Sequence, residues 1–109
     1  MLECIFGSAV VEKILLYLLV YKTGYIRGIA KLYNIPLSTI VNQLDRLENG
    51  GVIVSRKEGT IRIYSLNTRY PFIKELEALL QRAKDALPEN EKEKYYRHRT
   101  RPRRKGKAW

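Results

Sequence analysis

Apolar residues recur at helical spacing in several stretches of the chain, and polar segments separate these stretches. The first apolar stripe follows Ser8, a residue type that caps helix N-termini well. We predict a helix from there to residues 22–24, where Gly24 suits a C-terminal turn. Its apolar positions are Val11, Ile14, Leu15 and Leu18.

The pattern predicts a short second helix over 25–33 and a third over 37–49. Between them, Pro36 disfavours helix at the preceding residue, so a tight turn is expected at 34–36. Apolar residues of the third helix fall three, four and three positions apart, and its other face is polar. Two glycines after Asn49 end it.

Two short runs after the third helix favour β-strands. Residues 52–54 are apolar and β-branched, and residues 61–66 alternate with period two. The segment 55–60 between them is expected to form a basic hairpin tip, with Gly59 at a positive φ. A fourth helix is predicted over 71–87, with proline at its first position. The chain is therefore predicted to be mainly α with a small β-hairpin.

Two helices joined by a tight turn can dock as a helix-turn-helix, which leaves the second helix free to enter a DNA major groove. The polar face of helix 37–49 suits this role. Ser38 and Thr39 near its start can bond phosphates, and Asn42 and Gln43 can pair with adenine edges. Arg46, one turn later, can reach guanine or phosphate.

Each of these residues also has a simpler interpretation. Ser38 and Thr39 can be residues that favour a helix start and have no contact with DNA, and Asn42 and Gln43 can be ordinary solvated positions. Asp45 on the same helix either faces away or disfavours phosphate. The basic hairpin tip can be an ordinary charged turn.

With this order of elements, residues 8–66 resemble the winged helix-turn-helix regulators of the ArsR-like and MarR-like type. The resemblance rests on residues 26–30 (IRGIA), 36–48 (PLSTIVNQLDRLE), 50–53 (GGVI) and 56–59 (RKEG). It implies a winged helix-turn-helix with an added C-terminal helix, and a homodimer on a palindromic operator. The implied groove-facing positions are Ser38, Thr39, Val41, Asn42, Gln43 and Arg46, and the implied wing contacts are Arg56, Lys57, Thr60 and Arg62.

The resemblance also implies that the first and last helices form much of the dimer interface. The apolar stripe of helix 71–87 is wide for a helix that covers so small a core. We therefore predict that one part of the stripe packs on the core and the other part forms the dimer interface. The alternative is a helix that simply packs back on the first one. The expected interface residues are Val11, Leu15, Phe72, Leu76, Leu79, Leu80 and Ala83.

ArsR-type metal sensors place cysteines in the helix before the recognition turn, and this chain departs from that pattern. Its one cysteine, Cys4, and its one histidine, His98, lie elsewhere. Neither a metal nor a cofactor is therefore expected. The chain also has no Ser/His/Asp or Cys/His set and no phosphate-cradling loop, so we do not expect an enzyme.

Positive charge strengthens the case for a polyanionic partner. The net charge is +10, and residues 88–109 carry nine basic and three acidic residues against 12 and eight in residues 1–87. We divide the chain into a winged helix-turn-helix domain, 1–87, whose dimerisation helix spans about 71–87, and a basic, flexible tail, 88–109.

Residues 99–102 of this tail are similar to the core of an AT-hook, although Thr100 stands where AT-hooks have glycine. The alternative is a tail that only improves solubility. The tail residues expected to contact DNA are Arg99, Arg101, Arg103 and Arg104.

The sequence thus predicts a sequence-specific, double-stranded DNA-binding transcriptional regulator. The alternative is an RNA-binding or protein-interaction adaptor that uses a winged helix and a basic tail. The longest apolar run, residues 14–21, is far shorter than the roughly 20 residues of a membrane span, and the N-terminus lacks the pattern of a signal peptide. A cytoplasmic protein without membrane contact is expected.

Overall fold

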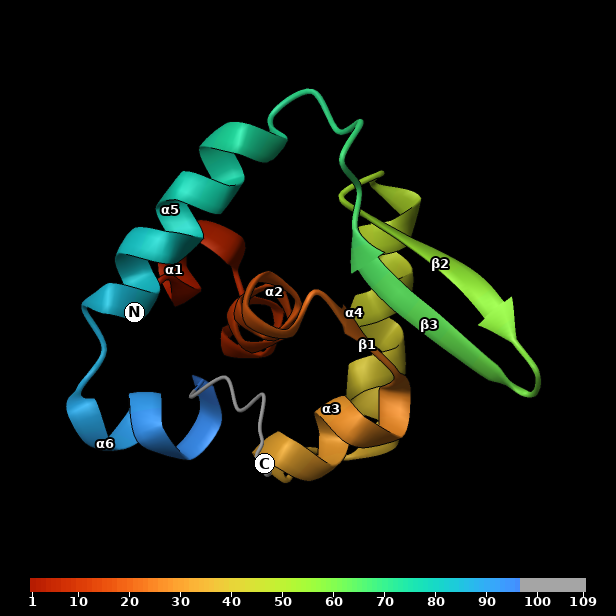
Figure 1. The fold of residues 1–109 in the computed structure, drawn as a ribbon, viewed down its shortest axis with the longest axis horizontal. Helices are drawn as coiled ribbons and strands as arrows, with labels where there is room; N and C mark the ends of the chain where they lie inside the picture. The colour runs from red at the N-terminus through yellow and green to blue at the C-terminus, as the bar shows by residue number, and fades with distance from the viewer. Residues whose placement is uncertain (97–109) are drawn as a thin grey trace, which may run out of the picture.

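Helices surround one central helix, and a β-hairpin projects from them, in the computed structural model, which describes residues 1–96 (Figure 1). The elements in chain order are α1 (Glu3–Phe6), α2 (Ala9–Tyr21), β1 (Thr23–Gly24), α3 (Ile26–Tyr33), α4 (Leu37–Asn49), β2 (Ile53–Glu58), β3 (Ile61–Leu66), α5 (Ile73–Asp85), α6 (Glu89–Glu91) and the π-helix η1 (Lys92–Tyr96). None of the helices within residues 1–96 has the length and apolar character that a membrane span requires.

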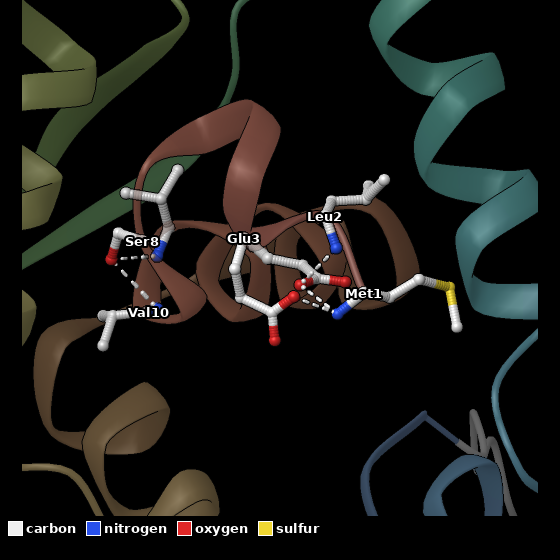
Figure 2. A network of polar contacts seen from close by, with 7 residues as sticks. Met1, Leu2, Glu3, Ser8 and Val10 are labelled. Atoms are coloured by element: carbon white, nitrogen blue, oxygen red, sulfur yellow. Dashed lines mark hydrogen bonds and ion pairs between the residues drawn. The ribbon is translucent and has the colours of Figure 1, made fainter.

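The central helix is α2, which is apolar on most of its sides and therefore has to be buried. Ile14, Leu15 and Leu18 are almost completely inaccessible to solvent. The helix packs against α1, α3, α4, α5, β1 and β3. Its start is capped as predicted, because the Ser8 hydroxyl accepts hydrogen bonds from the N–H groups of Val10 and Val11 (Figure 2).

A buried carboxylate ties the first residues of the chain to α2. Glu12, only 5% exposed, accepts hydrogen bonds from the Leu2 N–H at 3.0 Å and from the Met1 amine at 3.3 Å. The same amine also contacts Glu3, and this hydrogen bond raises the pKa of the amine (Figure 2). A buried charge is costly unless it is paired, so these contacts compensate for the burial of Glu12.

The predicted helix-turn-helix is present as α3 and α4. In the turn between them, Asn34 has a left-handed conformation (φ 56°), and the Ile35 N–H bonds to the Ala30 carbonyl at 3.0 Å. Ile40 and Leu44 anchor α4 in the same buried cluster as Ile29 and Ala30. The bounds of α4 coincide with the predicted ones.

The hairpin is the wing of the predicted fold; β3 has the predicted bounds, whereas β2 extends four residues further than the sequence indicated. β2 and β3 pair from Ile53 with Leu66 to Glu58 with Ile61, which leaves a turn of only Gly59 and Thr60. Gly59 has a φ of 65°, as expected for such a turn. The prediction of a loop was wrong for residues 55–58, because ladder pairing with β3 outweighs the low strand propensity of their charged side chains.

A third strand, β1, was not predicted. It pairs with β3 at Ser65 and Tyr64, so the sheet has the order β1-β3-β2. Gly24 lies in this strand instead of ending α2, which ends at Tyr21 and is followed by Lys22 with a φ of 74°. A Cβ at Gly24 would lie 2.6 Å from the Tyr17 ring, so close packing against α2 explains the glycine.

The fold continues past residue 87, where the sequence analysis placed the start of the tail. η1 packs on the core through Tyr95 and the buried Tyr96. The Tyr33 hydroxyl donates to the Lys13 carbonyl at 2.9 Å and lies 3.0 Å from the Tyr96 hydroxyl, while the Tyr21 hydroxyl donates to the Tyr95 carbonyl. We call Tyr21, Tyr33, Tyr95 and Tyr96 the tyrosine clasp. Burial raises the pKa of Tyr33 and raises that of Tyr96 to about 12.

Because Tyr96 of the tyrosine clasp has a raised pKa, we predict that the folded chain loses stability at alkaline pH. The Tyr96 pKa is about 12 in the folded chain and about 10 in an unfolded one, so its stabilising contribution is complete below pH 10 and is lost as the pH rises through 12. Between pH 9 and pH 11, the wild type should therefore lose roughly 1 kcal/mol more unfolding free energy than Tyr96→Phe. Urea denaturation at both pH values measures this difference, and equal losses would contradict the assignment.

Candidate nucleic-acid interface

An exposed polar ridge runs along α4 on the side away from the core. Ser38, Asn42 and Arg46 are exposed and spaced by four residues, so they lie on one face of the helix. Ile40 and Leu44 are fully buried beneath them. Asn49 is also exposed and continues the ridge; the sequence analysis treated it only as a helix end, although its spacing of seven from Asn42 was a usable signal.

The other predicted α4 residues flank this ridge. Thr39, Val41 and Gln43 are half-buried, and Gln43 Oε1 accepts a hydrogen bond from Arg46 Nη1 at 3.4 Å. The sequence left the direction of Asp45 open, and the structure exposes it. The outer surface of α4 therefore offers amide, hydroxyl and guanidinium groups together with one carboxylate.

The predicted wing residues Arg56, Lys57, Thr60 and Arg62 are all exposed. Lys57 and Arg62 stand directly opposite each other in the ladder, and neither has an acidic partner among residues 1–96. Like charges in such a pair repel and destabilise the hairpin. Arg56 differs, because its Nε bonds to the Glu58 carboxylate at 2.8 Å.

A chain of hydrogen bonds joins α4 to the wing. The Ser55 hydroxyl donates to Glu48 Oε2 at 2.7 Å, and Arg62 Nη1 donates to the Ser55 oxygen at 3.0 Å. Burial raises the pKa of the neighbouring Tyr64 hydroxyl, and the Glu48 and Asp45 carboxylates raise it further. These contacts fix the wing relative to the end of α4.

The seven predicted interface residues do not share one environment. Val11, Leu15, Leu80 and Ala83 are buried within a single copy of the chain, Leu76 is half-buried, and Phe72 and Leu79 are 62% and 36% exposed.

Five of the seven predicted interface residues nevertheless line one apolar groove of about 510 Å³: Val11, Leu15, Phe72, Leu76 and Leu79. Its lining comes from α1, α2, the last turns of α4 and the start of α5. The contribution of α1 was not predicted, although Leu2, Ile5 and Phe6 are spaced as on a helix; Ile5 is 64% exposed. We call this surface the apolar groove; its lining includes Ile5, Phe6, Phe72, Leu76 and Leu79.

The remaining predictions concern the basic tail and metal binding. Arg99, Arg101, Arg103 and Arg104 lie outside the described residues. Within residues 1–96, no group of three or more His, Cys, Asp or Glu side chains is placed to hold a metal ion, and Cys4 is exposed.

No protein-family model and no curated protein matches the sequence, but solved structures do. One is the homodimeric winged helix-turn-helix DNA-binding domain of Mb0332 from Mycobacterium bovis, a possible ArsR-family transcriptional regulator. It is 25% identical with a TM-score of 0.58, over 88% of this chain and 81% of that one.

A second similar structure is ZitR of Lactococcus lactis, a zinc-responsive MarR family member. It is 20% identical with a TM-score of 0.50, over 79% of this chain and 67% of that one. A double mutant of ZitR in its apo form is 17% identical with a TM-score of 0.50, over 84% and 78% of the two chains. The chain described here thus has the winged helix-turn-helix fold and is structurally similar to transcriptional regulators of the MarR and ArsR families.

Proposed function

We propose that the chain is a sequence-specific, double-stranded DNA-binding transcriptional regulator. The observation that carries this proposal is the exposed polar ridge of α4, presented by the buried Ile40 and Leu44. A major groove admits one α-helix, and the ridge offers it side chains that can bond base edges. The similarity to Mb0332, whose winged helix-turn-helix is described as a DNA-binding domain, supports the proposal.

Each side chain of the ridge has a role that its chemistry allows. Asn42 can bond an adenine edge with two hydrogen bonds, and Arg46 can bond guanine in the same manner. Asp45 repels phosphate but can accept a hydrogen bond from the amino group of cytosine. Ser38, near the helix start, suits a phosphate. Asn42, Asp45 and Arg46 therefore read bases, the half-buried Gln43 bonds an adenine edge beside them, and Ser38 sets the position of the helix.

The wing brings positive charge to the DNA backbone or minor groove beside the bases that α4 contacts. Lys57 and Arg62 repel each other across the hairpin, so a phosphate placed between them relieves a repulsion that the free protein carries. Because Arg62 is tied through Ser55 to Glu48, the wing is held at a fixed place relative to the base-reading helix.

The proposed active form is a homodimer that assembles through the apolar groove. Exposed apolar side chains gathered around one groove can mark an interaction surface. Phe72, Leu79 and Ile5 project at the groove while Leu80 and Ala83 hold α5 to its own core. The homodimeric state of Mb0332 supports the same arrangement. A two-fold dimer places its recognition helices about 34 Å apart, one turn of DNA.

Replacing Asn42 or Gln43 by alanine tests the reading role of α4. Each variant should lose about 1–3 kcal/mol of discrimination between selected and random duplexes while keeping most of its affinity for random DNA. The selected duplexes come from a random pool bound by the wild type, and affinities are measured by fluorescence anisotropy at fixed salt.

The exposed Asn90 of α6 provides a matched control, since Asn90→Ala should leave discrimination unchanged. Equal losses on selected and random DNA for Asn42→Ala would refute the proposed role. Stronger competition by structured RNA than by duplex DNA would favour the adaptor alternative.

Phe72→Glu tests the dimer. A charge on this exposed side chain should leave the fold intact but should prevent burial against a second copy. We expect the wild type to sediment as a dimer at micromolar concentration and Phe72→Glu as a monomer with an unchanged circular dichroism spectrum. Lys74→Glu, also exposed on α5, makes a control that should remain dimeric. A monomeric wild type contradicts the proposal.

A further inference from the structure

A basic pocket lies between the wing and the start of α3, where the wing residues Thr60 and Arg62 meet Tyr25 and Arg27. It has a volume of about 210 Å³ and is lined by residues 25–27 and 60–62. β1 pairs only with Ser65 and Tyr64, so the outer edge of β3 at Ile61 is free of a neighbouring strand. The first turn of α3 lies beside this free edge, and the pocket forms between them.

The pocket is positively charged. Arg27 and Arg62 both line it, and no acidic side chain does. Arg62 is oriented by its hydrogen bond to Ser55, which uses one of the five N–H groups of the guanidinium. Arg27 is exposed and has no ion pair or side-chain hydrogen bond among residues 1–96. Two guanidinium groups thus face one small space without a counter-charge.

Tyr25 is held at the pocket by a glycine. Gly28 lies inside α3, where glycine costs about 1 kcal/mol relative to alanine. A Cβ at Gly28 would lie 3.0 Å from Cε1 of the Tyr25 ring, so the glycine allows the ring to lie against the helix. Tyr25 remains 42% exposed. Tyr25 and the exposed Thr60 both line the pocket, and each carries a hydroxyl that can act as a neutral donor.

We propose that this pocket binds one backbone phosphate of the duplex that α4 reads. Arg27 and Arg62 supply the charge, and Tyr25 and Thr60 supply hydroxyl donors. A guanidinium matches phosphate geometry with two parallel hydrogen bonds, which a small pocket with two arginines favours. The pocket adjoins α3, which packs against α4, and it includes Arg62, which is tied to α4 through Ser55. This inference rests on the proposed DNA-binding function.

The test is the salt dependence of duplex binding by Arg27→Gln. Loss of one phosphate contact in each protomer of the dimer should reduce the slope of log K against log salt by about 1.8, that is about 0.9 per contact. That change corresponds to about 60-fold weaker binding at 0.1 M salt when affinities converge at 1 M. Arg27→Lys keeps the charge and should keep the slope. Lys74→Gln removes an exposed charge from α5 and should also keep it.

The outcomes separate this inference from the proposed function. Discrimination that depends on Asn42, together with an unchanged slope in Arg27→Gln, overturns the phosphate pocket alone. A wild type that does not bind duplex DNA overturns both. A reduced slope in Arg27→Gln and an unchanged slope in Lys74→Gln support the pocket, provided that Arg27→Gln and the wild type have the same melting temperature.

Discussion

The burial of α2 on nearly all its sides is the interaction on which the other elements depend. Each fully buried side chain such as Ile14, Leu15 or Leu18 contributes about 1.5–3 kcal/mol, whereas an exposed ion pair such as Arg56–Glu58 contributes about 0–1 kcal/mol. Because α2 packs against both α4 and α5, one apolar helix sets the positions of the polar ridge and of the apolar groove. Hydrophobic packing therefore positions the surfaces, and the polar residues give them their chemistry.

The two surfaces meet at the last turns of α4. Arg46 belongs to the polar ridge, yet it also lines the apolar groove together with Leu47 and with Leu76 and Leu79 of α5. Because both surfaces use the last turns of α4, a displacement of this helix moves both of them. From the other side, the hydrogen bonds through Ser55 join the wing to the same end of α4.

Much of the fold could be predicted because its signals are local. Pro36 and the glycines after Asn49 define α4 from both sides, and Ser8 defines the start of α2. The outward position of Ser38, Asn42 and Arg46 follows from the helical repeat once Ile40 and Leu44 are assigned to the core. The errors fall where partners are distant in sequence: β1 exists because it pairs with β3, and η1 is held by Tyr33, 63 residues before Tyr96.

The sequence by itself determined the order of α2, α3, α4 and α5, the wing and the polar face of α4, because period and capping are properties of neighbouring residues. Only the tertiary structure decided which apolar residues remain exposed: Leu80 and Phe72 belong to one stripe, yet α2 covers the first and leaves the second open. Only the tertiary structure also brought Arg27 beside Arg62. These residues are joined by no local pattern, and the pairing of β1 with β3 places their segments together.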